Sequence, residues 1–543
     1  MSVRCLLACA LMLMAATPGA RATDWIYHLR PTDNIWTLSR SYLKPGVSWQ
    51  QLQAYNHIAD PYHLAPGTRL RLPVAWLIVQ PARAKVVALI GHAQATEPGR
   101  PAQPVRMGMS FGIDTQLSTD AGASLTLQFA DGSRTLLLGD SRLSLDRLSA
   151  YGRTGMVDTR LRLQRGRISN EVMHQNGMAA HFSVATPSSI SSVRGTHFRV
   201  AADGSRQART EVLRGHVDVG GDRRHVMVNT GRGVVVAAGR RPGRVQPLLD
   251  PPSLHCPQAP ITRTAYPLTW DALRGAADYR VQVAPGTRFE ALVVDRTVAA
   301  AGANLPDLPD GSYLIRVHGI DARQLEGEDA SCAVTISAHP QPPAIMAPQA
   351  GSKVHGTRPA FRWTESTVAA SYAWQLASDA DFAHLLDQHP TLTGDGVRAA
   401  RALPYGRYYW RIASRDRAGK LGPYSDPLPF ELVPAPPAPA LAAPSHTGKQ
   451  LKLGWQAGLP GQRYRIQLAR ASGFGHPWLD RIVAQPLLEI GKPGHGVWYM
   501  RVRTIDTDGY AGPWSPTQKI KLPCLACRIA AVGGGAALLW LLL

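Results

Sequence analysis

The C-terminal half of the chain repeats at an interval of about 90 residues. Tryptophans at Trp270, Trp363 and Trp455 lie 93 and 92 residues apart, and each precedes a segment that starts with tyrosine and alternates in polarity. Further along, every copy has a glycine, an aromatic residue and an arginine, and an aspartate stands five residues after each arginine. Because the interval is regular, we expect three copies of one structural unit within residues 255–523.

Each copy has the pattern of a small β-sandwich. Segments of alternating polarity such as 279–283 predict strands, and turn residues separate them. The copies resemble fibronectin type III domains, because Gly-Pro-Tyr-Ser at 422–425 and Gly-Pro-Trp-Ser at 512–515 stand where that family ends. We expect the tryptophan to pack in the core and the arginine and aspartate to pair on a sheet face; carbohydrate binding through exposed aromatic residues is the alternative. The resemblance implies three β-sandwiches, at 255–339, 344–433 and 440–523.

The first 22 residues have the organisation of a secretory signal peptide. A positive start at Met1–Arg4 precedes an apolar stretch at Cys5–Ala16, and Ala20-Arg21-Ala22 fits the small-residue rule for cleavage. We therefore expect residues 1–22 to be removed and the mature protein to be exported. An uncleaved helix is the alternative.

Export places the remaining cysteines in an oxidising compartment, where disulfides persist. Cys256 lies at the start of the first repeat and Cys332 stands near its end, so we expect a disulfide that ties its first strand to its last. Cys524 and Cys527 form a C-x-x-C pair, but they lack the strand and helix of a thioredoxin site, and their role stays open. No His/Cys cluster has zinc-ligand spacing, so we expect no metal site.

The end of the chain is apolar. Residues 529–543 contain no charge, and as a helix they would span about 22 Å, against about 30 Å for the hydrocarbon core of a bilayer. If Arg528 snorkels to the surface, residues 525–543 can insert. We expect a C-terminal membrane anchor at 525–543. A processed sorting tail and an apolar end that packs on a partner are the alternatives.

Residues 24–76 read as strand, helix, helix and strand. Thr32 or Asp33 can cap the first helix, and Asn56 closes the second. The segment resembles the LysM family in the closing motif L-x-P-G-x-x-L-x-L-P at 64–73. It departs from the family at Thr32, where glycine usually precedes the aspartate. The other matching positions are Tyr27, Asp33, Asn34, Ile35, Trp36, Leu38, Tyr42, Trp49, Leu52 and Asn56.

The LysM resemblance implies binding to glycans that contain N-acetylglucosamine, which in an exported bacterial protein means peptidoglycan. LysM modules hold the sugar in a shallow groove between two loops, which correspond here to residues 33–35 and 56–61. Backbone groups and short polar side chains would bond the acetamide and hydroxyl groups, while Ile35 and Ile58 would cover the sugar face. Alternatively, Asp33 and Asn56 merely cap helices. The implied glycan-binding residues are Asp33, Asn34, Ile35, Asn56, Ile58 and Pro61.

Residues 80–247 predict a β domain, because segments such as 160–168 alternate between basic and apolar residues. This stretch resembles the periplasmic domain of FecR proteins in Phe-Ala-Asp-Gly-Ser at 129–133 and, above all, in Val-Arg-Gly-Thr-His-Phe-Arg-Val at 193–200. FecR proteins of iron uptake relay a signal from an outer-membrane receptor to a sigma factor, through a cytoplasmic segment and a membrane helix. Here a signal peptide and a LysM-like module precede the domain. The resemblance therefore implies only the β scaffold and a surface for an envelope receptor or sensor protein.

The formal net charge of +21 is compatible with nucleic-acid binding, yet we expect no nucleic-acid partner. No block of five like charges occurs, and no basic segment is interleaved with stacking aromatic residues. Basic strand faces would instead favour anionic wall polymers or lipids.

Enzyme activity is not expected. The Gly-x-Ser-x-Gly match at 108–112 lies among predicted strands and turns rather than at a strand-to-helix elbow. No paired catalytic carboxylates, H-E-x-x-H motif or Cys/His site is recognisable. We expect no catalytic residue and no cofactor.

Together these features predict a multidomain, mainly β protein. It consists of a small βααβ LysM module at 24–76, a FecR-like β domain at 80–247 and three fibronectin type III-like β-sandwiches. The expected function is non-catalytic: the protein binds peptidoglycan in the periplasm, the FecR-like domain contacts another protein, and the sandwiches are spacers held at a membrane. The alternative is a periplasmic signal-transduction or regulatory component of FecR type that senses the envelope. A wall hydrolase is the third hypothesis.

Overall fold

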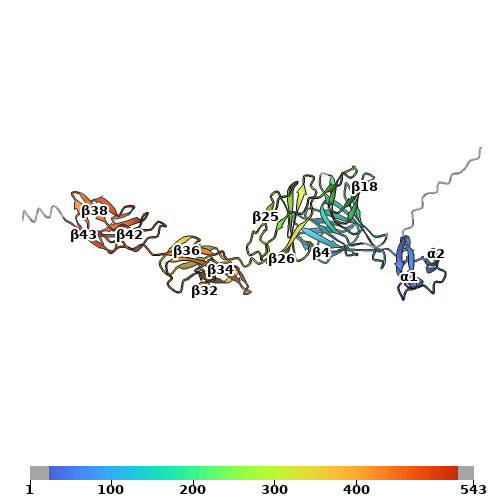
Figure 1. The fold of residues 1–543 in the computed structure, drawn as a ribbon, viewed down its shortest axis with the longest axis horizontal. Coiled ribbons are helices and arrows are strands. Elements are labelled where there is room, and N and C mark those ends of the chain that lie inside the picture. Colours follow the sequence, from blue (N-terminus) through green and yellow to red (C-terminus); the bar gives the residue numbers. More distant parts are fainter. Residues whose placement is uncertain (1–23, 175–176, 178, 205, 524–543) are drawn as a thin grey trace, which may run out of the picture. The chain divides into compact units, whose positions relative to one another are not determined.

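The computed structural model describes residues 24–174, 177, 179–204 and 206–523, and strands dominate it (Figure 1). The expected signal peptide at 1–22 and the expected anchor at 525–543, together with Cys524 and Cys527, lie outside these residues. Within the described part, no helix is both long and apolar enough to cross a membrane. The chain divides into two compact units, one up to Ser337 and the other from Ala338 onward.

The N-terminal module consists of two short helices and a two-stranded antiparallel sheet, in which Asp24 lies opposite Pro73. The first helix begins where the side chain of Asn34 accepts a 2.8 Å hydrogen bond from the N–H of Thr37. The second begins with a capping box formed by Ser48 and Gln51. The elements are β1 (Asp24–His28), α1 (Ile35–Tyr42), α2 (Trp49–Tyr55), β2 (Arg69–Pro73) and the 3-10 helix η1 (Val74–Trp76).

The middle domain contains two sheets around one apolar core. The first sheet has the order β6-β5-β8-β11-β12-β13-β14-β17-β18, with β3 beside β11, and the second has the order β7-β4-β9-β10-β12-β15-β16-β19-β20. The strands of the first sheet are β3 (Gln80–Pro81), β5 (Ala93–Thr96), β6 (Gln103–Pro104), β8 (Gln116–Thr119), β11 (Arg142–Ala150), β12 (Val157–Glu171), β13 (His181–Ala185), β14 (Ile190–Val193), β17 (His216–Gly221) and β18 (Arg224–Asn229). Those of the second are β4 (Ala84–Ile90), β7 (Ser110–Phe111), β9 (Ser124–Gln128), β10 (Arg134–Leu137), β15 (His197–Ala202), β16 (Gln207–Arg214), β19 (Arg232–Ala237) and β20 (Gln246–Pro247).

Strand β12 belongs to both sheets of the middle domain. Its first part pairs with β11 and β13, and its last part pairs with β10 and β15. The change comes at Gly166, whose φ of +96° is left-handed and whose position leaves no room for a Cβ beside Ser141. In the core, the ring of Phe182 meets those of Phe129 and Phe198 edge-on.

Three β-sandwiches follow, each with a three-stranded sheet and a larger sheet. Sandwich 1 pairs β21 (Leu254–His255), β22 (Pro267–Trp270) and β25 (Gly302–Asn304), and separately β24 (Val294–Val298), β23 (Ala276–Pro285), β26 (Gly311–Asp321) and β27 (Ala330–Ile336). Sandwich 2 pairs β28 (Ile345–Ala347), β30 (Ala360–Trp363) and β33 (Gly396–Arg398), and separately β29 (Ser352–His355), β36 (Leu428–Val433), β34 (Gly406–Asp416), β31 (Ala369–Ala377) and β32 (Leu385–Leu392), with β35 (Leu421–Tyr424) beside β34. Sandwich 3 pairs β37 (Ser445–Thr447), β38 (Gln450–Gly454) and β41 (Leu487–Gly491), and separately β40 (Leu479–Val483), β39 (Arg463–Ala469), β42 (Gly496–Ile505) and β43 (Gln518–Leu522). In sandwich 2, β29 and β36 run parallel, from Ser352 opposite Phe430 to His355 opposite Val433.

The repeated tryptophans pack in the three cores, as the sequence predicts. They are 3%, 0% and 5% exposed. Each ring contacts the tyrosine of the following strand, with ring centres 5.4 to 5.6 Å apart. The hydroxyl of each tyrosine in turn accepts a hydrogen bond from the backbone N–H six residues before it.

The expected pairing of the repeated arginine with the repeated aspartate is wrong. Each arginine donates a 2.8 Å hydrogen bond to a glutamine on the neighbouring strand and lies over a phenylalanine ring. Each aspartate stands where its strand ends and accepts backbone N–H groups of the turn. The two side chains therefore stabilise different parts of the sandwich. The arginines are Arg316, Arg411 and Arg501, and the aspartates are Asp321, Asp416 and Asp506.

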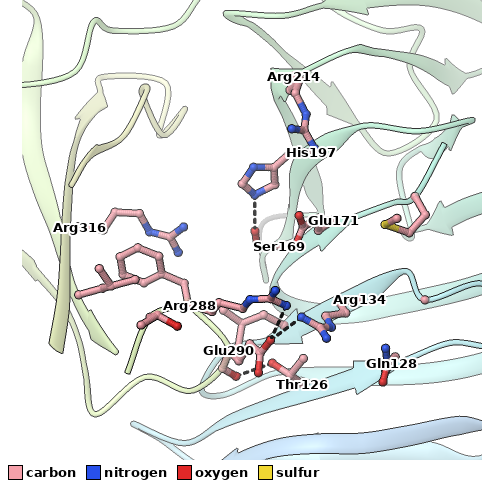
Figure 2. Close-up of a pocket in the computed structure, with 16 residues that line it drawn as sticks. Thr126, Gln128, Arg134, Ser169, Glu171, His197, Arg214, Arg288, Glu290 and Arg316 are labelled. Atoms are coloured by element: carbon pink, nitrogen blue, oxygen red, sulfur yellow. Dashed lines mark hydrogen bonds and ion pairs between the residues drawn. The ribbon is translucent and has the colours of Figure 1, made fainter. Parts of the chain in front are cut away.

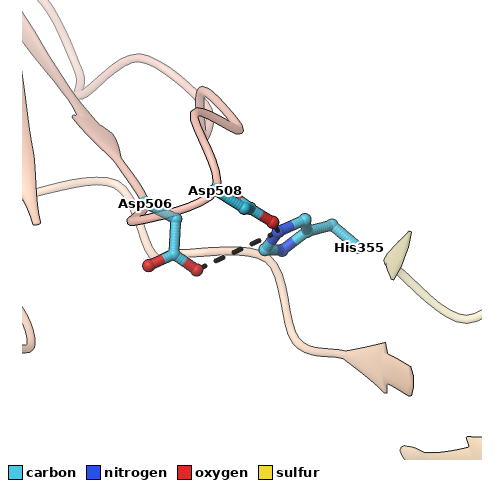
Figure 3. Close-up of side chains that lie close together, drawn as sticks. All are labelled: His355, Asp506 and Asp508. Carbon is cyan, nitrogen blue, oxygen red and sulfur yellow. Dashed lines mark hydrogen bonds and ion pairs between the residues drawn. The ribbon is translucent and has the colours of Figure 1, made fainter. Parts of the chain in front are cut away.

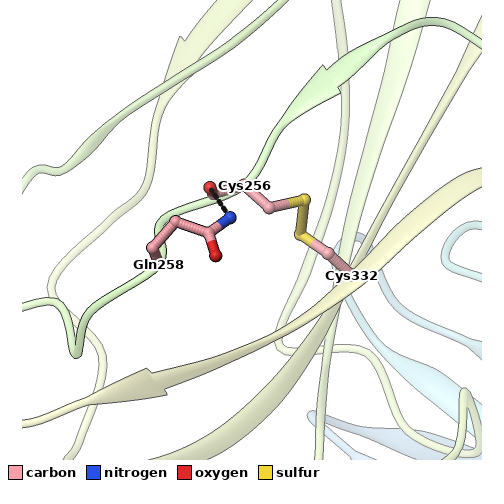
Figure 4. The surroundings of a disulfide bond; sticks show 3 residues. All are labelled: Cys256, Gln258 and Cys332. Carbon is pink, nitrogen blue, oxygen red and sulfur yellow. Dashed lines mark hydrogen bonds between the residues drawn. A yellow bond between two sulfur atoms is a disulfide. The ribbon is translucent and has the colours of Figure 1, made fainter.

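A disulfide bond joins Cys256 and Cys332, whose Cα atoms are 6.4 Å apart (Figure 4). Cys256 directly follows β21 in the small sheet of sandwich 1, while Cys332 lies in β27 of the large sheet. The bond therefore ties the two sheets of this sandwich together.

Candidate functional site

The first loop of the N-terminal module is shaped by its own polar side chains. The carboxylate of Asp33 accepts hydrogen bonds from the hydroxyl of Tyr27 at 2.6 Å and from the N–H of Arg30 at 2.8 Å. Burial and the contact with Asp33 raise the pKa of Tyr27 to about 12, so this hydroxyl remains a donor. Asn34 caps α1. The polar side chains at the predicted site thus hold the loop in place.

The expectation that the side chain of Ile35 covers a sugar face is wrong. Ile35 is 0% exposed, because it is the first residue of α1 and points into the core of the module. Only its backbone is left to take part in binding at this position.

The second loop is held by Asn56. Its side-chain amide donates to the carbonyls of Leu52 and Arg71, and its oxygen accepts a 2.7 Å hydrogen bond from the N–H of Arg71. The side chain therefore connects the end of α2 to β2. Ile58 is half-buried against the core of the module, and Pro61 is half-buried too.

Two exposed aromatic rings lie beside these loops. Trp36, in the first turn of α1, is 36% exposed, and Tyr62, next to Pro61, is 73% exposed. Their ring centres are 5.5 Å apart, and Trp36 also contacts Trp49. The carboxylate of Asp60 accepts from the N–H of Tyr62 and from His63, and these contacts lower its pKa and fix the loop. We call Trp36, Trp49 and Tyr62 the aromatic cluster.

Trp36 is one of the positions that match the LysM family, whereas Tyr62 is not among them. The buried positions of α1 are Ile35, Leu38 and Ser39. These residues form the buried side of the helix. Because successive helical residues are turned by about 100°, Trp36 points away from Ile35 and lies outside this buried side. An exposed tryptophan close to an exposed tyrosine can stack on an apolar face of a ligand, while backbone groups of the loops bond its polar atoms.

A second candidate site is a groove of about 760 Å³ between the middle domain and sandwich 1 (Figure 2). On one side lie strands of the second sheet, and on the other lie β26 and the loop that contains Thr287–Glu290. The charged lining residues are Arg134, Arg214, Arg288, Arg316, Glu171 and Glu290.

Four arginines against two carboxylates make this groove positive. Arg134 and Arg288 both meet Glu290. His197 does not add to the charge at neutral pH, because burial and the neighbouring arginines lower its pKa to about 4; its Nε2 lies 3.3 Å from the hydroxyl of Ser169. The groove can therefore accept an anionic group.

The contact between the middle domain and sandwich 1 also buries charged side chains. Glu326 lies 3.3 Å from Arg280 and 3.9 Å from Arg199. Burial opposes its ionisation, but Arg280 and its neighbours outweigh this, and the pKa of Glu326 lies well below its usual value. Burial, and then the charge of Glu326, raise the pKa of Glu211 to about 8. The interface is therefore built around ionic contacts that depend on both domains.

The Gly-x-Ser-x-Gly segment does not form a nucleophile elbow. Ser110 begins the two-residue strand β7, and β8 follows it rather than a helix. A nucleophile elbow requires a strand-to-helix turn.

Two parts of the chain match known families. Residues 27–73 match the family described as LysM domain, and residues 115–218 match the family described as FecR protein. This chain combines a segment that matches LysM domains, a segment that matches FecR proteins and three β-sandwiches. We refer to the N-terminal module as the LysM domain and to the middle domain as the FecR-type domain. The LysM match covers almost all of the N-terminal module, and the FecR match runs from just before β8 into β17 of the middle domain. A comparison with curated proteins found no match.

Solved structures resemble parts of the chain. The FN1–FN3 domains of chicken CNTN1 share 16% identity over 51% of this chain and 99% of theirs, with a TM-score of 0.25. A putative anti-sigma factor from Parabacteroides distasonis shares 18% identity over 24% of this chain and 57% of its own, with a TM-score of 0.20. The fibronectin(III)-like modules of Clostridium thermocellum CbhA share 19% identity over 33% of this chain and 93% of theirs, with a TM-score of 0.24.

Proposed function

We propose that this protein is a non-catalytic component of the bacterial cell envelope whose LysM domain binds peptidoglycan. The family matches support an envelope protein, and the matched families are not catalytic. The LysM family implies glycan containing N-acetylglucosamine as the ligand class. In this proposal the FecR-type domain contacts another protein and the sandwiches act as spacers.

The observation that carries the proposal is the pair of exposed rings, Trp36 and Tyr62, beside the two loops of the LysM domain. The sugar ring would stack on them, and its acetamide group would meet backbone N–H and carbonyl groups of residues 33–35 and 56–61. Among the six residues implied from the sequence, Asp33, Asn34 and Asn56 shape the site, Ile35 contributes backbone only, and Ile58 and Pro61 border it.

Retention on purified peptidoglycan tests this function. The full chain should sediment with peptidoglycan, and the double variant Trp36→Ala, Tyr62→Ala should bind about 5- to 150-fold more weakly, since each ring contact is worth about 0.5–1.5 kcal/mol. Tyr405→Ala is the control, because Tyr405 is an exposed aromatic residue of sandwich 2. Wild-type affinity in the double variant would contradict the proposed site.

Salt separates glycan recognition from attraction by charge. The formal net charge of +21 attracts anionic wall polymers, and this attraction weakens as salt is raised. Binding through the aromatic cluster should persist. If raised salt abolishes retention altogether, charge rather than glycan recognition holds the protein.

The second candidate function is a regulatory or signal-transduction component that senses the envelope. The positive groove beside the FecR-type domain favours it, since an acidic segment of a receptor or sensor protein would fit there. A photo-crosslinker at Arg214, on the groove, should capture one defined envelope protein. The same probe at Arg224, on β18 of the other sheet, should not. Equal labelling from both positions would argue against a docking site in the groove.

The location proposed is the periplasm, after removal of residues 1–22. Attachment to a membrane through residues 525–543 is a separate proposal that rests on their apolar sequence. N-terminal sequencing should find Thr23 first. The full chain should fractionate with membranes, and a chain that ends at Pro523 should be released.

A further inference from the structure

Three side chains converge where sandwich 2 meets sandwich 3 (Figure 3). His355 ends β29 of sandwich 2, and Asp506 and Asp508 lie in the turn after β42 of sandwich 3. The Nε2 atom of His355 is 2.7 Å from a carboxylate oxygen of Asp508 and 3.9 Å from one of Asp506. One nitrogen and two oxygens thus lie within 4.8 Å of one another.

The hydrogen bonds around the cluster leave Nε2 of His355 and one oxygen of each aspartate facing one another. Nδ1 of His355 lies 3.3 Å from the carbonyl of Pro434, and Nε2 lies 2.7 Å from the carboxylate of Asp508, so each ring nitrogen faces an oxygen acceptor. Asp506 uses its other oxygen for the N–H of Thr507, and Asp508 uses its other oxygen for the N–H of Tyr510. The position between Nε2 and the two carboxylates can therefore hold either the proton of Nε2 or a metal ion that Nε2 ligates.

The histidine is held as a metal ligand usually is. Its side chain is 2% exposed, and its ring is stacked on Tyr510, with ring centres 3.9 Å apart. A backbone carbonyl that accepts from the second ring nitrogen is the common support of a metal-bound histidine. Asp506 and Asp508 remain 19% and 29% exposed, which leaves a path for an ion from solvent.

The second aspartate is specific to the third repeat. The equivalent turn of sandwich 2 has the same backbone hydrogen bonds, from Asp416 to Lys420 as from Asp506 to Tyr510. Two residues after the repeated aspartate, however, sandwich 2 has Ala418 where sandwich 3 has Asp508. The turn folds without this carboxylate, so its presence is not needed for the turn.

We propose that His355, Asp506 and Asp508 bind a divalent transition-metal ion, with Zn²⁺ as the reference ion. Imidazole nitrogen combined with carboxylate oxygen suits first-row ions such as Zn²⁺, whereas Ca²⁺ and Mg²⁺ prefer oxygen ligands alone. With three protein ligands, water would complete the coordination. Because the ligands come from both sandwiches, the ion would fix the joint across the linker at 434–439.

Zn²⁺ titration of the EDTA-treated full chain tests the proposal. We expect the wild-type chain to bind one more Zn²⁺ than Asp508→Ala, which recreates the turn of sandwich 2 and should fold. His355→Gln should lose the same equivalent, while His384→Ala should keep it, since His384 pairs with Asp379 alone. Circular dichroism checks that each variant is folded.

Hydrogen exchange gives a second readout. Zn²⁺, but not Ca²⁺, should slow exchange in residues 352–355 and 506–510 of the wild-type chain and leave Asp508→Ala unchanged. Equal Zn²⁺ stoichiometry in the wild type, His355→Gln and Asp508→Ala would overturn the proposal, because the three side chains would then be held by hydrogen bonds alone. Unchanged exchange in the wild type, or tighter binding of Ca²⁺ than of Zn²⁺, would overturn it as well.

Discussion

Arg199, on β15 of the FecR-type domain, forms a buried ion pair with Asp329 of sandwich 1. Their side chains are 6% and 19% exposed, and Asp329 also lies 2.9 Å from Nδ1 of His318. The pair joins two domains through residues that are 130 positions apart in the sequence. Since each charge depends on a partner in the other domain, the stabilities of the two domains are coupled.

Removing one member of this pair should destabilise both domains. Asp329→Ala leaves Arg199 and Arg316 without their shared carboxylate, and breaking a buried ion pair costs about 3–5 kcal/mol. The free energy of unfolding, measured with urea and probes in each domain, should fall for both together. Asp480→Ala is the control: its pair with Arg465 is more exposed, and such pairs are worth about 1 kcal/mol or less. Equal losses from the two variants would contradict the coupling.

The contribution of Glu211 to the stability of the same interface should fall as the pH rises. The raised pKa of Glu211, about 8 against the ordinary 4.5, means that the folded state keeps its proton longer than the unfolded state. This stabilisation is complete below pH 4.5 and is lost as the pH rises through about 8. Between these values the contribution of Glu211 should fall by up to about 1.4 kcal/mol per pH unit. Urea unfolding across this range should show a steeper decline for the wild type than for Glu211→Gln, and Glu171→Gln, on an exposed position of β12, should follow the wild type.

The disulfide of sandwich 1 should matter for stability. It closes a loop of 76 residues, and a loop of this size corresponds to about 4 kcal/mol in the chain-entropy account of cross-links. Dithiothreitol should therefore lower the urea midpoint of the wild type. The double variant Cys256→Ser, Cys332→Ser should have this lower midpoint without the reagent, and dithiothreitol should not change it further. A response to dithiothreitol that survives in the double variant would assign the effect to other cysteines.

Stability and binding should separate within the LysM domain. Asn56→Ala removes one hydrogen bond to Leu52 of α2 and two to Arg71 of β2, and it leaves backbone groups unpaired, at a cost of about 1–3 kcal/mol. Hydrogen exchange should therefore accelerate in β1 and β2. Tyr62→Ala, at a largely exposed ring, should leave exchange unchanged while weakening peptidoglycan retention. Faster exchange in both variants would mean that Tyr62 is structural.

Features that repeat or lie close together in the sequence could be predicted from it. The spacing of Trp270, Trp363 and Trp455 indicates three sandwiches and their cores, and strand–helix–helix–strand describes the LysM domain. The arginine and aspartate of each repeat were paired wrongly, because spacing along a strand does not tell which neighbour on the adjacent strand a side chain meets. Gln282, for example, reaches Arg316 from β23.

Apart from the disulfide between Cys256 and Cys332, the contacts between distant segments could not be predicted. Nothing local indicates that Arg199 faces Asp329, or that His355 meets Asp508, which is 153 residues away. A search for metal ligands by their spacing in the sequence finds only clusters within one loop or helix. It therefore could not bring His355 together with Asp506 and Asp508. The exposure of Trp36 could not be predicted for a different reason: a short helix has few turns, and its buried stripe cannot be located to within one residue from apolar residues alone.

The parallel pairing of β29 with β36 has a mechanical consequence. Strand β29 comes early in the sequence of sandwich 2 and β36 comes last, and the two strands run in the same direction. Tension applied to the two ends of this sandwich therefore pulls the strands past each other, so that the bonds from Ser352 to His355 carry the load at the same time. If the LysM domain is fixed to the wall while the other end of the chain is held elsewhere, sandwich 2 would resist force in shear rather than open one bond after another.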